Sequence, residues 1–289
     1  MITSQAKSAA ILEEKHRKAL VNLLADEDAK VYRTVRETIL SYGPASSDWM
    51  REHTLSNDPI LRRRAREIVD QFARQDSDTH FLAFCLNQGE DFDLEQGVLL
   101  LCRTQYPDIN LEAYSALLDS YAGDLRQRLD LNGLPEHIIR VINDYLYREL
   151  KFAGDEQNFY DPKNSYFNRV LDRRIGNPIT LSLLYLLLAR RLRLPMAGIG
   201  LPGHFLCRFQ SSRAEMYIDP FKGGRMLVKA DCVKMVMQLQ HRFDDSFLAP
   251  FSARRILQRI CSGLHQVYIQ QKSTHQAERL QRYLVALAK

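Results

Sequence analysis

An apolar run at residues 181–189 constrains this chain more than any other feature. The run follows Asn177 and Pro178 and ends at Arg190. Asn is a favoured N-cap, Pro is favoured in the first helical turn, and basic residues suit the last turn. The pattern therefore predicts a helix that begins at Pro178. Because the run is apolar on most faces and far shorter than the roughly 20 residues that cross a bilayer, we expect a helix at the centre of a domain rather than a membrane span.

The pattern changes after this helix. Short apolar runs separated by Pro, Gly and Ser are typical of a small antiparallel sheet, and they occupy residues 196–201, 205–209, 215–218 and 225–228. Helical patterns lie on both sides of these runs, at residues 94–105, 111–129, 135–150, 231–240, 252–270 and 274–288. The predicted fold class is α+β, mostly helical, with a central helix against a small antiparallel sheet.

The first third of the chain contains a repeat. Residues 28–37 align with residues 58–67, and the two segments share an aspartate, two arginines and a glutamate at the same positions. Their apolar residues follow the i, i+4, i+8 spacing of a buried helix face. The segments resemble HEAT-type repeats. The alternative is a chance likeness between two amphipathic helices.

Several classes of site are excluded by composition and spacing. The five cysteines are odd in number and form no C-x-x-C, which favours reduced thiols in a cytoplasmic protein over disulfides or a zinc site. The eight histidines include no H-E-x-x-H, so we predict no metal. A G-x-G-x-x-G at residues 198–203 leads into a strand instead of a helix, so we predict no dinucleotide and no other cofactor.

His204 and Asp219 form the strongest candidate pair. His204 opens one predicted strand and Asp219 closes the next. Two adjacent antiparallel strands could place the carboxylate beside the imidazole, as in the base and orienting acid of a nucleophilic triad. The alternatives are a purely structural hydrogen bond, or no contact.

Four motifs occur in a fixed order: NFYDPKNSYFNRVLDRR at residues 158–174, GNPITLS at 176–182, LPGHFL at 201–206 and IDPFKGG at 218–224. Together they resemble the bacterial family described as regulator of sirC expression, with transglutaminase-like and TPR domains. The resemblance implies a papain/transglutaminase-like core. The repeat predicts HEAT-like helices at residues 1–88, outside this resemblance, and the resemblance implies the transglutaminase-like domain at 89–229 and a helical TPR-like tail at 230–289.

In the wider transglutaminase and papain-like superfamily, a Cys lies at the N-terminus of the central helix, and a His and an Asp come from the following strands. The resemblance assigns the last two roles to His204 and Asp219. The helix start at Asn177 and Pro178 holds no cysteine. The resemblance therefore implies an empty nucleophile position.

Other nucleophiles are weak candidates. Strand alternation turns Cys207 away from His204. The hydroxyls of Thr180 and Ser182 lie near the helix start, where a capping role competes with a catalytic one. We predict that four residues line the cleft or bind a ligand: Asn164, Thr180, Tyr160 and Tyr166.

These observations favour a non-catalytic transglutaminase-like protein that binds a protein partner as an interaction or regulatory module. One alternative is a cysteine-independent hydrolase or acyl-transfer enzyme that uses His204 and Asp219. Another is nucleic-acid binding through the arginine-rich helices. The net charge of only +5, and the acidic residues that follow Arg62–Arg64, argue against nucleic acid. No membrane association is expected.

Overall fold

The computed structural model describes residues 14–212, 214–239 and 242–289. The chain forms two compact units, Met1–Thr79 and His80–Lys289. This division differs from the predicted boundaries at residues 88 and 229. Side chains from Phe81 to Leu287 share one hydrophobic core, so the end of the N-terminal segment and the helical tail belong to the same unit as the central segment.

The first unit is helical. Its elements are α1 (Glu14–Leu24), α2 (Ala29–Ser41), α3 (Ala45–Arg51), the 3-10 helix η1 (Glu52–Leu55) and the first part of α4 (Pro59–Asn87). The two aspartates of the sequence repeat have the same role, because each accepts hydrogen bonds at a helix start. Asp28 accepts from Lys30 N at 2.7 Å, and Asp58 accepts from Ile60 N at 2.8 Å. The repeat therefore marks two helix N-termini.

Two members of the arginine run are engaged inside this unit. The Arg64 guanidinium is buried and donates to Leu24 O at 2.7 Å and to Asp26 O, which satisfies carbonyls at the end of α1. Arg62 donates to Ser56 O at 2.9 Å. These contacts give the arginines a structural role that is independent of any phosphate.

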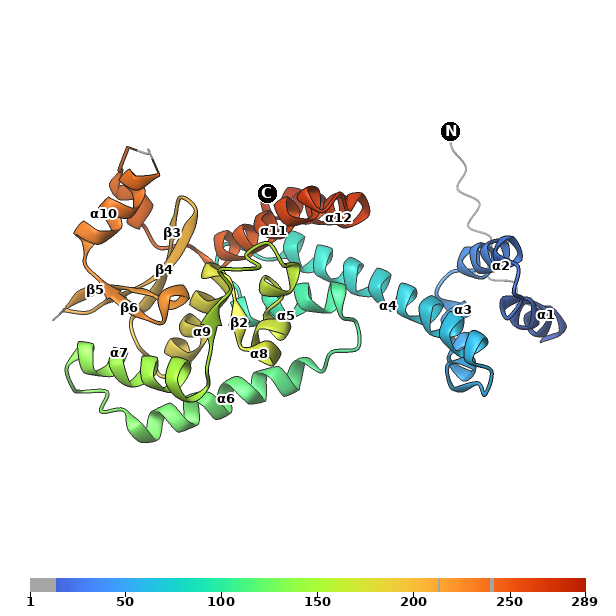
Figure 1. Ribbon diagram of the computed structural model, residues 1–289, viewed down its shortest axis with the longest axis horizontal. Helices are drawn as coiled ribbons and strands as arrows, with labels where there is room; N and C mark the ends of the chain where they lie inside the picture. Colours follow the sequence, from blue (N-terminus) through green and yellow to red (C-terminus); the bar gives the residue numbers. More distant parts are fainter. Residues whose placement is uncertain (1–13, 213, 240–241) are drawn as a thin grey trace. The chain divides into compact units, whose positions relative to one another are not determined.

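The second unit combines helices with a small sheet (Figure 1). Its larger helical elements are α5 (Leu94–Gln105), α6 (Leu111–Arg128), α7 (Pro135–Asn143), the π-helix η2 (Asp144–Glu149), α8 (Phe167–Arg173), α9 (Pro178–Arg191), α10 (Lys229–Gln238), α11 (Ala253–Gln270) and α12 (Thr274–Leu287). The antiparallel sheet has the order β3 (Met196–Leu201), β4 (His204–Gln210), β5 (Glu215–Asp219) and β6 (Arg225–Leu227). The predicted α+β fold class, mostly helical, is confirmed.

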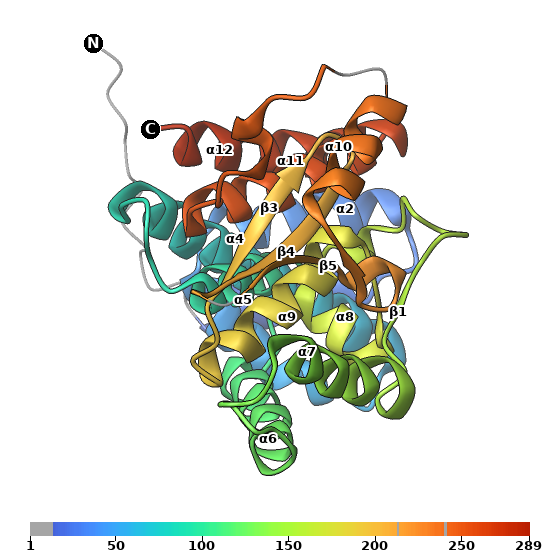
Figure 2. The same cartoon turned by 90° about the vertical axis from the view of Figure 1, so that its left-hand side faces the viewer.

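The sheet separates two layers. Phe205 and Cys207 of β4 belong to the core that contains α9, whereas Leu206 packs with Cys232 and Val236 of α10. Figure 2 shows α9 and α10 on opposite sides of β3 and β4. This alternation follows from the two-residue period of a strand. No helix in the described part of the chain is long and apolar enough to cross a membrane.

A second, two-stranded sheet was not predicted. It pairs β1 (Ala153–Gly154) with β2 (Ile175–Gly176) in parallel. Each strand comes shortly after a residue with left-handed backbone, Lys151 at φ 62° and Arg174 at φ 58°. These turns carry no Gly or Asn, which is why the pattern did not reveal them. The small sheet sets the position from which α9 starts.

A buried arginine, Arg254, donates hydrogen bonds to the C-terminal carbonyls of two helices. The Arg254 guanidinium donates to Cys85 O at 3.0 Å and to Gln88 O at the end of α4. It also donates to Leu287 O at 3.0 Å at the end of α12. Carbonyls in the last turn of a helix have no partner within the helix, so one buried cation supplies the donors for both ends.

We expect Arg254→Met to lower the free energy of unfolding by about 2–4 kcal/mol, because it leaves several buried carbonyls without donors. Arg255→Met is the matched control, since Arg255 is exposed and lies on the same helix. Urea denaturation followed by far-ultraviolet circular dichroism measures both. Equal losses in the two variants would contradict the role given to Arg254.

Candidate functional site

His204 and Asp219 are in contact. His204 Nε2 lies 2.9 Å from Asp219 Oδ2, and the two side chains are 16% and 5% exposed. Cys207 pairs with Ile218 in the β4–β5 register, so the same register continued by one residue sets Asp219 beside Leu206. His204 is then a diagonal neighbour of Asp219 on one face of the sheet, a separation that these side chains can span.

The Asp219 carboxylate also holds the turn that follows it. Its Oδ1 accepts from Phe221 N at 3.1 Å and from Lys222 N at 3.3 Å, which caps the 3-10 helix η4 (Pro220–Lys222). A carboxylate only accepts hydrogen bonds, so His204 Nε2 is the donor to Oδ2. This arrangement leaves Nδ1 as the ring nitrogen that can meet a ligand.

A set of contacts that sequence reasoning missed supports this turn. Gly224 N donates to Asp219 O at 2.9 Å. The Asn143 side chain donates to Gly224 O at 2.7 Å and accepts from Tyr185 OH at 3.1 Å. Gly223 and Gly224 both have positive φ, at 67° and 75°. The Gly-Gly pair after Pro220 was the available signal for a tight turn, but nothing in the sequence pointed to Asn143.

The start of α9 is closed by hydrogen bonds. Asn177 Oδ1 accepts from Thr180 N at 3.0 Å, and Asn177 N donates to Thr180 Oγ1 at 3.1 Å, which forms a capping box. The Thr180 hydroxyl donates to Asn164 O at 2.8 Å. Pro178 occupies the first helical position and offers neither a nucleophile nor an N–H.

The candidate hydroxyl nucleophiles are not aimed at the imidazole. Thr180 and Ser182 are fully buried, and Ser182 Oγ donates to Phe205 O at 3.3 Å. Among the hydrogen bonds of the described residues, none joins either hydroxyl to His204. Both hydroxyls therefore have structural partners: Thr180 at the cap of α9, and Ser182 between α9 and β4.

All five cysteines are buried. Burial raises the pKa of Cys85 and Cys102 to about 12 and that of Cys232 to about 11. Burial also raises the pKa of Cys207 and Cys261 above that of a free thiol. Cys207 Sγ lies 3.5 Å from Ser182 O, on the side of β4 that packs on α9. Each thiol is therefore neutral near neutral pH.

The residues expected to line a cleft have different positions. Asn164 and Tyr166 are buried together with Thr180, and Tyr166 OH lies 3.1 Å from Tyr268 OH in the core. Asn164 links the chain before α8 to the start of α9. Tyr160 is 57% exposed. Only Tyr160, of these four, presents a side chain to the surface.

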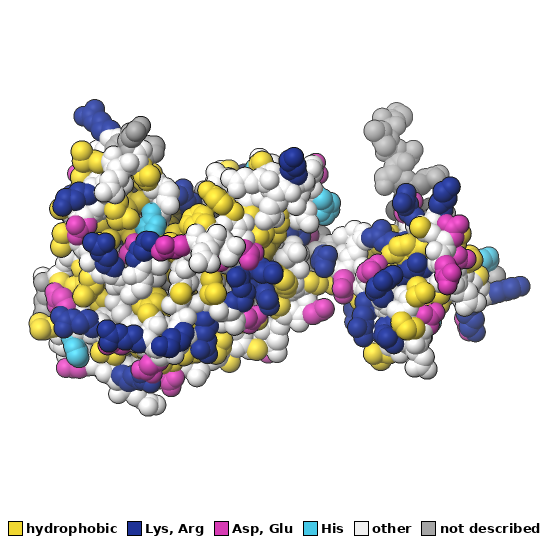
Figure 3. Space-filling model, in the orientation of Figure 1, with side chains coloured by type: hydrophobic (Ala, Val, Ile, Leu, Met, Phe, Trp, Pro, Cys, Tyr) yellow, Lys and Arg dark blue, Asp and Glu magenta, His cyan; other side chains and the backbone are white. Residues whose placement is uncertain are grey.

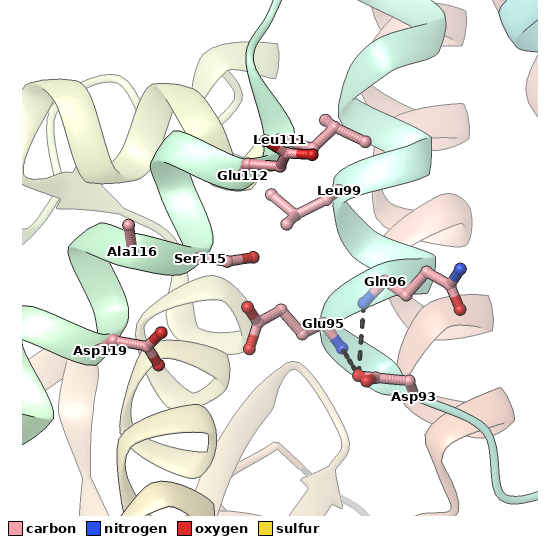
Figure 4. Close-up of a pocket in the computed structure, with 9 residues that line it drawn as sticks. All are labelled: Asp93, Glu95, Gln96, Leu99, Leu111, Glu112, Ser115, Ala116 and Asp119. Atoms are coloured by element: carbon pink, nitrogen blue, oxygen red, sulfur yellow. Dashed lines mark hydrogen bonds between the residues drawn. The ribbon is translucent and has the colours of Figure 1, made fainter.

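A separate pocket of about 350 Å³ lies between α5 and α6 (Figure 4). Its acidic residues are Asp93, Glu95, Glu112 and Asp119. Arg191 Nη1 binds Glu95 at 2.6 Å and its Nε binds Asp119 at 2.7 Å, so these two carboxylates hold the last turn of α9. No three His, Cys, Asp or Glu side chains of the described residues are grouped so that they could hold a metal ion.

Several known proteins are similar in sequence to this chain. A family model of the transglutaminase-like superfamily matches residues 112–262. A UPF0162 protein of Xylella fastidiosa (strain 9a5c) is 37% identical over 188 residues, which cover 62% of this chain and 66% of that protein. A UPF0162 protein of Pseudomonas aeruginosa is 34% identical over 123 residues, 42% of this chain and 44% of that protein.

A relative also occurs in an animal. F-box only protein 21 of Mus musculus is 28% identical over 204 residues, 68% of this chain but 30% of that protein. The chain thus spans just under two thirds of the first Xylella relative and less of the others. No solved structure matches. The family match covers more than half of the sequence and includes α9, the four-stranded sheet and the His204–Asp219 pair, so the chain belongs to the transglutaminase-like superfamily.

Proposed function

We propose that this chain is a non-catalytic transglutaminase-like protein that binds a protein partner as an interaction or regulatory module. The observation that carries the proposal is the start of α9. By the family resemblance, the nucleophilic thiol would belong at this helix start, which Asn177 and Pro178 occupy and a capping box closes. A His–Asp pair without a nucleophile can orient and bind, but it cannot form a covalent acyl intermediate.

The distribution of the relatives supports a module. The mouse F-box only protein 21 matches over 30% of its own length, so there the related segment is joined to much additional sequence. In this chain, a helical unit precedes the second unit, and the helix pair α11 and α12 closes that unit's core. We propose that the partner binds to these helices. HEAT-like helices are predicted for residues 1–88 and a TPR-like tail for residues 230–289, and the family resemblance suggested a role in regulating expression.

The His204–Asp219 contact favours a second candidate function. An imidazole held by a buried carboxylate can serve as a general base. An enzyme built on it would activate water rather than a thiol. Hydrolysis of a peptide or ester that is lost in His204→Ala would identify that activity.

We expect the five thiols to be unreactive in the folded protein. With a pKa near 12, about one Cys85 or Cys102 thiol in 10,000 is ionised at pH 8. The thiolate fraction rises with pH, and only above pH 11 does it become large. Reaction with Ellman's reagent at pH 8 should release little colour until a denaturant exposes all five thiols. Rapid reaction of one native thiol would contradict the assignment.

We also expect no covalent capture that depends on the imidazole. Wild-type protein should not be labelled by a fluorophosphonate or a peptidyl electrophile above the level of His204→Ala, as read by intact-protein mass spectrometry. His137→Ala is the matched control, because His137 is an exposed histidine on α7. Labelling that disappears in His204→Ala and Asp219→Ala but persists in His137→Ala would replace the proposed function with the enzyme.

A further inference from the structure

A row of aromatic rings leads from the surface to His204. The ring centroids of Tyr160 and Phe159 are 5.3 Å apart, those of Phe159 and Phe221 are 6.0 Å apart, and those of Phe221 and His204 are 6.1 Å apart. Tyr160 and Phe159 are 57% and 38% exposed, whereas Phe221 is buried. The row therefore begins in solvent and ends at the imidazole.

The loop that carries the outer two rings is held in place. Asp155 Oδ1 accepts from Asn158 N at 2.8 Å, and the buried Asn164 side chain donates to Asn158 O at 2.9 Å. Gln271, the residue after α11, donates from its Nε2 to Tyr160 O at 3.4 Å. Exposed aromatic side chains on a fixed backbone have already lost much of the conformational freedom that binding would remove. Such residues are typical anchors of an interface.

A second apolar side chain, that of Leu239, lies beside the β3–β4 turn. Leu239 is 51% exposed, and its Cδ1 lies 3.4 Å from the place that a Cβ on Gly203 would occupy, next to His204. Figure 3 shows hydrophobic side chains gathered at the α10 end of the second unit. The exposed hydrophobic residues of β6, of α10 and of the link between them include Met226, Val228 and Met237.

The charges beside the row cancel. Lys222 Nζ lies 2.6 Å from Glu156 Oε1, and Nζ is 5.5 Å from the centroid of the Phe221 ring. Both side chains are at least half exposed. This ion pair adds no net charge at the rim, and the two aspartates of the same loop, Asp155 and Asp161, are both paired with Arg173 at 3.9 and 3.5 Å. The row therefore suits a neutral ligand with a large apolar side chain.

We propose that the exposed rings of Tyr160 and Phe159, backed by the buried Phe221, form the binding site for an aromatic or long aliphatic side chain of an extended, neutral peptide segment. The same segment donates a backbone N–H to Nδ1 of His204, whose orientation Asp219 fixes. This inference rests on the proposed function and names the chemistry of its partner. The retained His–Asp pair then works as a hydrogen-bonding group rather than as a catalyst.

Blocked pentapeptides with a single central side chain test the proposal. Gly-Gly-Phe-Gly-Gly and Gly-Gly-Ala-Gly-Gly, acetylated and amidated, are titrated against the full chain and followed by ligand-observed NMR. Burial of a Phe side chain predicts binding about 10- to 100-fold tighter for the first peptide. Equal affinities for the two peptides would overturn the proposal.

Variants locate the binding. Phe159→Ser and Tyr160→Ser should each weaken the Phe peptide about 5-fold or more, since each removes one wall of an apolar contact. Leu131→Ser is the matched control, because Leu131 is 44% exposed and follows α6 in the same unit. Its affinity should equal that of wild type. Circular dichroism verifies that the variants fold, and a loss shared by all three variants would overturn the assignment.

The fate of the peptide separates this inference from the proposed function. Mass spectrometry after the titration should recover it intact. A Phe-selective peptide that is cleaved in a His204-dependent manner would keep the aromatic site and reject the non-catalytic function. A peptide that is neither bound selectively nor cleaved would reject the aromatic site alone.

Discussion

Helix α9 is apolar on most of its faces and presents no polar face to solvent. Its residues from Pro178 to Ala189 are buried almost without interruption, under the sheet on one side and α6, α8 and α11 on others. A helix of this kind is stable only when other elements enclose it. Its enclosure therefore dictates the layered arrangement of the second unit. It also fixes the position of the first turn of α9.

Asp219 gives the His–Asp pair a structural role that does not depend on catalysis. One oxygen of the carboxylate meets the imidazole, and the other meets two backbone N–H groups of η4. A substitution that removed the carboxylate would leave buried donors unpaired as well as freeing His204. The pair is thus maintained by the stability of the turn, and its presence is no measure of catalysis.

Local patterns predicted most of the elements of the second unit. The capping residues and the apolar run defined α9, and alternation with turn residues defined β3 to β6, because these signals act over a few residues. The same reasoning predicted that His204 lies beside Asp219 and that the Cys207 side chain points away from His204. It could not find Asn143, Phe221 or the small parallel sheet, since their roles depend on contacts between distant segments. Burial of Asn164 and Tyr166 was likewise a property of packing and not of pattern.

The Arg254 contacts bear on what counts as a domain in this protein. The family match ends at residue 262, yet one guanidinium holds carbonyls at Cys85 and at Leu287, well outside the matched segment on both sides. A fragment with the matched boundaries would keep Arg254 but lose these carbonyl acceptors, whose hydrogen bonds offset the cost of burying the guanidinium. Sequence kinship and cooperative folding therefore have different limits here. The inherited segment is the middle of a larger folding unit.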